Sequence, residues 1–303
     1  MTTPTELNAR FGLEEQLRFN TLGDGMVVAE ISTGQCQARI ALQGAQVMEW
    51  TPTGQQAVIW LSTDASFKAG KSIRGGAPVC WPWFGPHDSN DKAYPAHGYA
   101  RTVDWDVLST EALEDGRLRL VFRLKETDAS RALWPHDSPV ELHITLGTRL
   151  ELELITRNNE SAAIEISEAL HTYFAVGDVR QVTVSGLDKT EYLDKVNNFA
   201  RCTQQGGVNF AGEVDRVYLN TEAECVIEDS SMNRHLHIKK QGSRSTIVWN
   251  PWIEKALAMG DLGKDGYLNM LCVESGNAAE NLVSIEPGGE HRLCVEYWVE
   301  AAN

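Results

Sequence analysis

The 303-residue sequence lacks the features that most often place a chain in a known functional class. No stretch approaches 18 consecutive apolar residues, and the N-terminus has no basic start followed by an apolar run, so we expect neither a membrane span nor a signal peptide. The motifs G-x-G-x-x-G, G-x-x-x-x-G-K-[ST], H-E-x-x-H and G-x-S-x-G are missing. Their absence removes the usual sequence evidence for dinucleotide, P-loop, zinc-peptidase and hydrolase-elbow chemistry.

Positive charge is also scarce. The sequence has 27 Lys and Arg residues against 42 Asp and Glu residues, which gives a formal net charge of −15. Nucleic acids and anionic membranes attract basic surfaces, so neither is an expected partner. Cysteines are few and form no C-x-x-C pair, and we expect them to be buried thiols of a protein in the reducing cytoplasm. They lie at Cys36, Cys80, Cys202, Cys225, Cys272 and Cys294.

The sequence is rich in alternation of apolar and polar side chains with a period of two. At 149–156 (R-L-E-L-E-L-I-T) the leucines fall on one side of an extended chain and the charged residues on the other. Many short strands with few helical patterns predict an all-β fold, an antiparallel β-sandwich or barrel, with one helical turn at 127–136. The other strand-like runs are at 26–32, 36–42, 103–109, 117–125, 141–146, 163–170, 179–185, 214–219, 224–228, 234–239, 244–249, 269–274 and 290–299.

One region breaks this rhythm. Residues 64–102 are rich in Gly, Pro, Trp and His and are far longer than a hairpin loop, and long loops in compact domains are often functional. No repeat, low-complexity tract or linker divides the chain. We therefore expect a single domain over residues 1–303, with residues 1–20 as a peripheral N-terminal segment.

Two candidate segments lie in the long loop. In S-I-R-G-G-A-P-V-C-W-P-W-F-G-P-H (72–87), glycines beside Arg74 allow a ligand to approach the backbone, and Trp81, Trp83 and Phe84 offer flat apolar faces for a sugar ring. The alternative is a packed loop that plugs one end of the sandwich. In A-H-G-Y-A-R (96–101), His97 and Arg101 are either ligand contacts or a capping histidine and a surface arginine.

Two further segments carry titratable groups at strand-like runs. His171 follows such a run in S-E-A-L-H-T-Y-F (167–174), and Glu274 ends the apolar run of N-M-L-C-V-E (269–274). Burial raises the pKa of a carboxyl group, which suits a general base. Alone, each residue is as well explained by a structural role. His235 and His237 share one strand face, but no third ligand is evident, so we predict no metal site.

In this order, the segments resemble the aldose 1-epimerase superfamily, and within it the hexose-6-phosphate mutarotase branch. The likeness extends over roughly residues 25 to 300. It rests on I-R-G-G (73–76), W-P-W-F-G (81–85), H-G-Y-A-R (97–101), A-L-H-T-Y-F (169–174), E-V-D-R-V-Y (213–218), W-N-P-W (249–252) and V-E-S-G-N (273–277).

The resemblance implies a galactose mutarotase-like β-super-sandwich that needs no metal or organic cofactor. It implies that His171 is the catalytic acid and Glu274 the catalytic base, and that Arg74, Arg101 and Asp215 bind substrate. We add His97 as a further substrate contact and as the replacement acid should His171 fail. One departure is Ala96, where family members can carry Gln before the H-G-x-A-R stretch.

The implied reaction interconverts the α and β anomers of a hexose 6-phosphate, most simply glucose 6-phosphate. A carboxylate at Glu274 takes the proton of the anomeric hydroxyl while a protonated His171 gives one to the ring oxygen, each worth ~10²–10⁴-fold. We expect the two groups on opposite sides of one pocket, a pyranose edge apart. Forked arginine donors match phosphate, and charges beyond a Debye length of about 8 Å are screened, so local arginines outweigh the net charge.

Three alternatives remain from the sequence. They are a mutarotase for an unphosphorylated sugar such as galactose, a non-catalytic carbohydrate-binding module, and a structural sandwich without a ligand. The arginines favour phosphate, and a binding module needs no His and Glu pair. We expect a small-molecule sugar phosphate as partner and a monomer in the cytoplasm.

Overall fold

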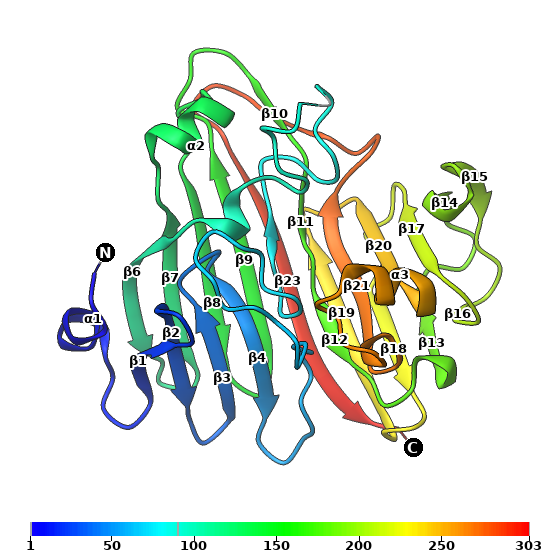
Figure 1. Ribbon diagram of the computed structural model, residues 1–303, viewed down its shortest axis with the longest axis horizontal. Helices are drawn as coiled ribbons and strands as arrows, with labels where there is room; N and C mark the ends of the chain where they lie inside the picture. The colour runs from blue at the N-terminus through cyan, green and yellow to red at the C-terminus, as the bar shows by residue number, and fades with distance from the viewer. Residues whose placement is uncertain (1, 90, 303) are drawn as a thin grey trace.

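The protein is described by a computed structural model over residues 2–89 and 91–302, and strands dominate it (Figure 1). Within these residues the strand pairings of the sheets are antiparallel. The predicted all-β antiparallel class is therefore confirmed. The long N-terminal sheet is β1 (Leu17–Leu22), β2 (Met26–Ser32), β3 (Cys36–Ala41) and β4 (Gln46–Pro52), in that order.

Two large sheets and one short ribbon complete the strand structure of the described residues. One large sheet runs β16 (Val208–Asn209), β13 (Val182–Ser185), β18 (Cys225–Asp229), β19 (Arg234–Gln241), β23 (Glu290–Ala301), β9 (Leu150–Arg157), β8 (Val140–Leu146), β7 (Leu118–Leu124), β6 (Trp105–Ala112). The other runs β15 (Ala200–Thr203), β14 (Glu191–Asp194), β17 (Val214–Tyr218), β20 (Ser245–Asn250), β21 (Met270–Asn277), β11 (Glu168–Leu170), β5 (Val79–Cys80), with β12 (Tyr173–Ala175) also on β21. The ribbon pairs β10 (Ile164–Ile166) with β22 (Val283–Ile285).

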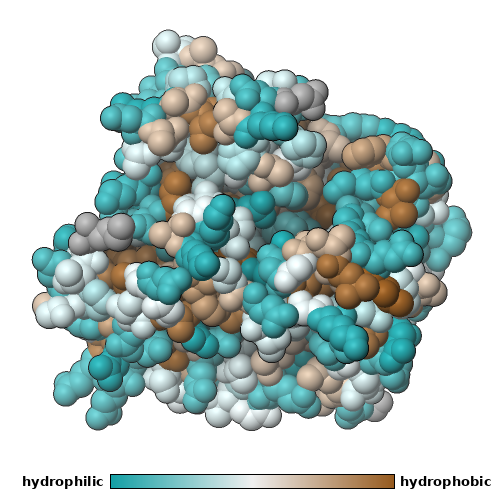
Figure 2. All heavy atoms as spheres, in the orientation of Figure 1, coloured by the Kyte–Doolittle hydropathy of each residue, from teal (hydrophilic) through white to brown (hydrophobic). Residues whose placement is uncertain are grey.

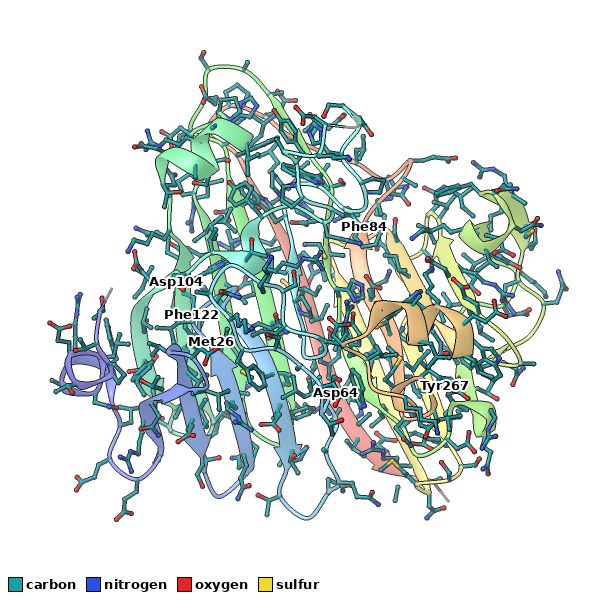
Figure 3. The ribbon with its side chains drawn as sticks, viewed as in Figure 1. Met26, Asp64, Phe84, Asp104, Phe122 and Tyr267 are labelled. Carbon is teal, nitrogen blue, oxygen red and sulfur yellow. The ribbon has the colours of Figure 1, made fainter. Side chains whose placement is uncertain are left out.

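These sheets form two layers. In Figure 1 the nine-stranded sheet spans the back of the molecule, with β1–β4 in front of its left half and the sheet of β21 in front of its right half. The alternation in the sequence explains the core between them, because Leu150, Leu152 and Leu154 on β9 are at most 1% exposed. Phe122 of β7, labelled in Figure 3, is likewise fully buried.

Helices are few and short. They are α1 (Pro4–Phe11), α2 (Asp128–Leu133) and α3 (Trp252–Met259), with 3-10 turns at Ala100–Thr102, Val179–Gln181, Lys195–Asn197 and Gly266–Leu268. The helical turn predicted at 127–136 is α2, whereas α1 and α3 were not predicted. Within the described ranges, no helix combines the length and apolarity needed to cross a membrane.

The N-terminal segment is more firmly attached than the term peripheral suggests. A capping box between Thr3 and Glu6 starts α1. Leu7 and Phe11 of this helix and Phe19 of β1 are buried in the main hydrophobic core. Residues 2–20 therefore lie at the edge of the molecule in Figure 1, yet their apolar side chains complete one end of its core.

The long loop is held against the sheet that carries the candidate site. Its short strand β5 pairs Val79 and Cys80 with Leu170 and Ala169 of β11. Near its end, the backbone passes so close to Trp81 that a Cβ on Gly98 would lie 1.9 Å from the Trp81 carbonyl oxygen, and Gly98 has φ 71°. Glycine is required there, and the contact places the segment that carries His97 and Arg101 beside the end of β5.

Candidate active site

Glu274 lies in the middle of β21, a strand in the interior of its sheet. Every residue of β21 is buried, and Glu274 itself is 1% exposed. The sequence places it at a strand end, but β21 continues to Asn277 because β11 pairs with its second half. A carboxyl group in such a place is costly to ionise, so it is a strong candidate for a functional role.

His171 lies in the gap between β11 and β12, two short strands that both pair with β21. Its backbone N–H donates to the Pro78 carbonyl in the long loop instead of to β21. The imidazole Nε2 lies 3.4 Å from Glu274 Oε1. Its ring stacks on Tyr173, with centroids 5.0 Å apart and planes inclined by 13°.

The two groups are therefore neighbours, and the prediction that they face each other across a pocket is wrong. The physical reason is the strand pairing, which sets residues of β21 beside residues of the β11–β12 connection. Any ligand that engages both groups must present two adjacent polar atoms to them from the same side.

A pocket of about 370 Å³ opens in front of this pair. This volume lies within the ~300–1,000 Å³ typical of small-molecule sites. It brings together the six residues to which the sequence analysis assigned a catalytic or substrate-binding role. The pocket is lined by Ser72, Ile73, Arg74, Pro78, Phe84, His97, Arg101, His171, Tyr173, Lys195, Asp215, Ile247, Trp249, Lys255, Met259 and Glu274.

The two arginines differ in how much of their hydrogen-bonding capacity is already used. Arg74 Nε donates to Asp261 Oδ1 at 2.9 Å and its Nη1 donates to the Tyr173 hydroxyl at 3.0 Å. Arg101 Nη2 donates to the Ala96 carbonyl at 2.9 Å, while its buried Nε has no hydrogen-bond partner among the described residues. Arg101 therefore has donors available for an anionic ligand.

Two lysines add to the positive charge of the pocket. Lys195 Nζ lies 3.0 Å from Asp215 Oδ1, and Lys255 Nζ lies 3.7 Å from Asp215 Oδ2. With the arginines they give four cations around one small pocket in a chain of net charge −15. The sequence offered no motif for either lysine, because both come from short segments outside the recognised stretches.

The pocket also shifts the protonation of its acid and base candidates. Burial raises the pKa of Glu274 well above its usual range, although Lys195 opposes this. Burial, with the nearby His97 ring and the charge of Arg101, lowers the pKa of His171 well below its usual range. The protein's own groups thus favour a neutral imidazole and a protonated carboxyl, the reverse of the charged pair expected from the sequence.

His97 lines the pocket beside His171, and its ring is neutral. Burial and then the charge of Arg101 lower its pKa to about 3. Its Nδ1 accepts a hydrogen bond from the Gly85 N–H at 3.3 Å, and its ring meets that of His171 edge-on at 5.7 Å. A neutral His97 can donate or accept hydrogen bonds to a ligand, but it is a poor source of a proton near neutral pH.

The aromatic prediction was partly wrong. Trp81 and Trp83 are buried in the core, where their indole N–H groups donate to Thr156 Oγ1 and to the Pro95 carbonyl. Only Phe84 of that group lines the pocket, and Figure 3 shows it near the sheet ends above α3. The packed-loop alternative therefore describes both tryptophans.

The flat faces of the pocket come mainly from elsewhere. Trp249 of β20 and Tyr173 of β12 line it together with Phe84. Both lie inside stretches that carried the family likeness, W-N-P-W and A-L-H-T-Y-F, so a signal for them was present. Outside the pocket, the exposed Ile253 and Leu257 give α3 the apolar surface seen in Figure 2.

Three of the buried side chains at the site are of types that can bind a metal. His171, Cys272 and Glu274 each offer a ligand atom, and these atoms lie within 4.8 Å of one another. Cys272 and Glu274 are two apart on β21 and so project to the same face. All six cysteines are free thiols, four of them buried and two, Cys202 and Cys294, partly exposed.

Comparisons with known proteins agree with this geometry. The family model described as "Aldose 1-epimerase" matches residues 28–298. An Escherichia coli K12 protein named "Putative glucose-6-phosphate 1-epimerase" is 40% identical over 247 residues, 81% of each chain. The crystal structure of a "putative mutarotase (YeaD)" from Salmonella typhimurium superposes with a TM-score of 0.89 at 34% identity, over 96% of each chain. A galactose mutarotase related enzyme from Lactobacillus acidophilus shares the fold at a TM-score of 0.71 and 12% identity, over 91% of this chain and 98% of that one.

Proposed function

The chain belongs to the aldose 1-epimerase family, and from this premise we propose that it interconverts the α and β anomers of hexose 6-phosphates, glucose 6-phosphate first among them. The E. coli relative is named after that activity, and the two chains align over most of their lengths. The observation that carries the proposal is the buried His171–Glu274 pair, 3.4 Å apart, at the floor of a pocket that also holds Arg74 and Arg101.

The adjacent placement of the pair suits the chemistry of the anomeric centre. The hydroxyl oxygen and the ring oxygen of a pyranose are both bonded to C1, so two neighbouring side chains can reach both from one side. Glu274 accepts the hydroxyl proton, the bond between C1 and the ring oxygen breaks, and His171 protonates that oxygen. Rotation of the resulting aldehyde and the reverse steps close the other anomer. Each proton transfer contributes ~10²–10⁴-fold.

The active pair carries one proton in total. The protein's own environment favours that proton on Glu274, and the mechanism needs it on His171. A phosphate between Arg74 and Arg101 offsets two of the positive charges that lower the pKa of His171. Substrate binding therefore shifts the proton toward the imidazole and prepares the pair for ring opening.

The remaining polar groups suit the two ends of a sugar phosphate. The spare donors of Arg101 and the guanidinium of Arg74 suit the phosphate, whose oxygens accept forked hydrogen bonds. Asp215, held by Lys195, is an acceptor for sugar hydroxyls. Phe84 and Trp249 offer faces for the C–H side of the ring.

The test is an NMR exchange measurement of α/β interconversion with glucose 6-phosphate and, in parallel, with galactose. Faster exchange with the phosphorylated sugar supports the proposal. Preference for galactose supports an aldose 1-epimerase for free sugars instead, and saturable binding without accelerated exchange supports a carbohydrate-binding protein.

Three further predictions from the sequence accompany this proposal. They are a monomeric state, a cytoplasmic location and a reaction that needs no metal or organic cofactor. A single domain over residues 1–303 is also retained, and it is supported by one continuous core that reaches from α1 to β23.

A further inference from the structure

We infer that His171, Cys272 and Glu274 form a binding site for Zn²⁺ whose occupation inhibits the enzyme. The ligand atoms of the three side chains lie within 4.8 Å of one another, and two of the residues, His171 and Glu274, line the pocket. Neither the family nor the relatives' names suggest a metal. The inference starts from a cysteine that the proposed reaction does not use.

The fold fixes the three residues on neighbouring backbone positions. Cys272 and Glu274 project from the same face of β21, and Tyr173, two residues after His171, is the register partner of Cys272. The thiol packs with Tyr173 and Trp249 in a small hydrophobic cluster. Ligands mounted on paired strands need little rearrangement to surround an ion.

The distances are close to those of tetrahedral zinc. Two ligands at ~2.0–2.1 Å from a tetrahedral ion are about 3.4 Å apart. His171 Nε2 and Glu274 Oε1 are 3.4 Å apart, which is too long for a strong hydrogen bond between them. A zinc–sulfur bond of ~2.3 Å places sulfur about 3.6 Å from the other ligands, so each distance from Cys272 Sγ, now within 4.8 Å, has to shorten by at most about 1.2 Å.

The donor set selects zinc over hard cations. A thiolate sulfur and an imidazole nitrogen suit Zn²⁺, which also accepts a carboxylate oxygen, whereas Mg²⁺ and Ca²⁺ prefer oxygen ligands alone. The thiolate and the carboxylate together balance the +2 charge of the ion. Glu274 Oε2 and His171 Nδ1 are buried without hydrogen-bond partners among the described residues, so the cluster has polar capacity that the protein leaves unused.

Three protein ligands leave one position of a tetrahedral zinc ion free, and because His171 and Glu274 line the pocket, water or a sugar oxygen can reach that position. The ion then occupies both groups needed for proton transfer, so Zn²⁺ and sugar phosphate compete. The inhibition rests on the proposed function, whereas the metal binding does not and can be measured without any substrate.

The experiment uses Co²⁺ as a spectroscopic probe for the site in the EDTA-treated full chain. Wild type should bind one Co²⁺ with a sulfur-to-cobalt charge-transfer absorption that Zn²⁺ abolishes and that Mg²⁺ and Ca²⁺ do not. Cys272→Ser should lose the band and bind Zn²⁺ at least ~10-fold more weakly, given that even outer-shell changes cost ~10–100-fold. Cys294→Ser, at a partly exposed thiol on β23, is the matched control and should keep the band.

Activity and an unmodified sample provide independent readouts. Zn²⁺ should inhibit anomer exchange by wild type and by Cys294→Ser, and EDTA should reverse this inhibition. Cys272→Ser and Cys272→Ala should keep near-normal exchange without metal and should not be inhibited by Zn²⁺. If both Cys272 variants misfold, X-ray absorption spectroscopy of zinc-loaded wild type tests the site instead. We expect one sulfur ligand at ~2.3 Å from the zinc. No sulfur ligand, or a band that persists in a folded Cys272 variant, overturns the inference. If wild type shows the cobalt absorption band but does not accelerate anomer exchange, only the proposed function is refuted.

Discussion

Replacing Arg101 by Gln tests how the pocket recognises phosphate. Arg101 spends one hydrogen bond on the Ala96 carbonyl and keeps a buried Nε without a partner among the described residues, so its guanidinium is available to substrate. A charge-assisted hydrogen bond contributes ~1.5–3 kcal/mol, and tenfold corresponds to ~1.4 kcal/mol. The KM for glucose 6-phosphate should therefore rise about 10–150-fold, while the KM for glucose changes less than about threefold.

The assay is NMR exchange at several concentrations of each sugar, with a melting curve to verify folding. Arg119→Gln is the matched control. The Nε of Arg119 is likewise buried and lacks a hydrogen-bond partner in the described part of the chain, but its guanidinium contacts His143 of β8, and neither residue lines the pocket. It should leave both KM values unchanged. An equal rise for both sugars in Arg101→Gln, or no rise at all, would show that Arg101 does not bind phosphate.

Three further predictions concern stability and metals. Partial burial lowers the pKa of His291, but the Glu168 carboxylate 2.9 Å away outweighs it and raises the pKa overall. The protonated imidazole beside Glu168 therefore stabilises the fold below the ordinary histidine pKa, and this contribution is lost as pH rises through the raised value. Melting temperatures of wild type and His291→Asn should differ most near pH 5–6 and converge in mildly alkaline buffer, and a pH-independent difference would refute this. Gly98→Ala should cost at least ~2 kcal/mol because its Cβ would meet the Trp81 carbonyl, whereas Gly212→Ala, with open space around it, should be nearly neutral in the same denaturant titration. Exchange activity should survive EDTA and dialysis, and a loss restored by a divalent ion would contradict the absence of a metal cofactor.

Much of the fold follows from local sequence pattern. The run at 149–156 predicts a strand, and the structure confirms it as β9, whose first residues alternate between buried and partly exposed. The helix α3 was missed because it spans only eight residues and exposes Ile253 and Leu257, so it lacks a clean apolar stripe. Residues 1–20 carry too few periodic positions to show that Phe11 and Phe19 join the core.

The site depended on a different kind of evidence. His171 and Glu274 are about a hundred residues apart in the sequence, where only the family likeness links them. Their proximity follows from the pairing of β11 with β21 in the structure. Their 3.4 Å separation could not be predicted, since it depends on the register of β21 against the β11–β12 connection. Trp81 was misassigned because sequence does not tell which side of an irregular loop faces the core.

The two lysines of the pocket could not be predicted from the sequence either. Lys195 and Lys255 come from a 3-10 turn and a short helix that no motif marks, yet both reach Asp215. The sequence contained a partial signal for Cys272 as a possible metal ligand. Its spacing of two from Glu274 already implied a shared face on any strand, but the third ligand, His171, is supplied by another segment.

The most direct test of the central claim is the exchange rate of glucose 6-phosphate anomers catalysed by Glu274→Gln. This change keeps the shape of the buried side chain beside His171 and removes its ability to take a proton. The account predicts a loss of ~10²–10⁴-fold in kcat, with an unchanged circular dichroism spectrum and little change in KM. Exchange at the wild-type rate in a folded Glu274→Gln protein would show that this pair does not carry the reaction.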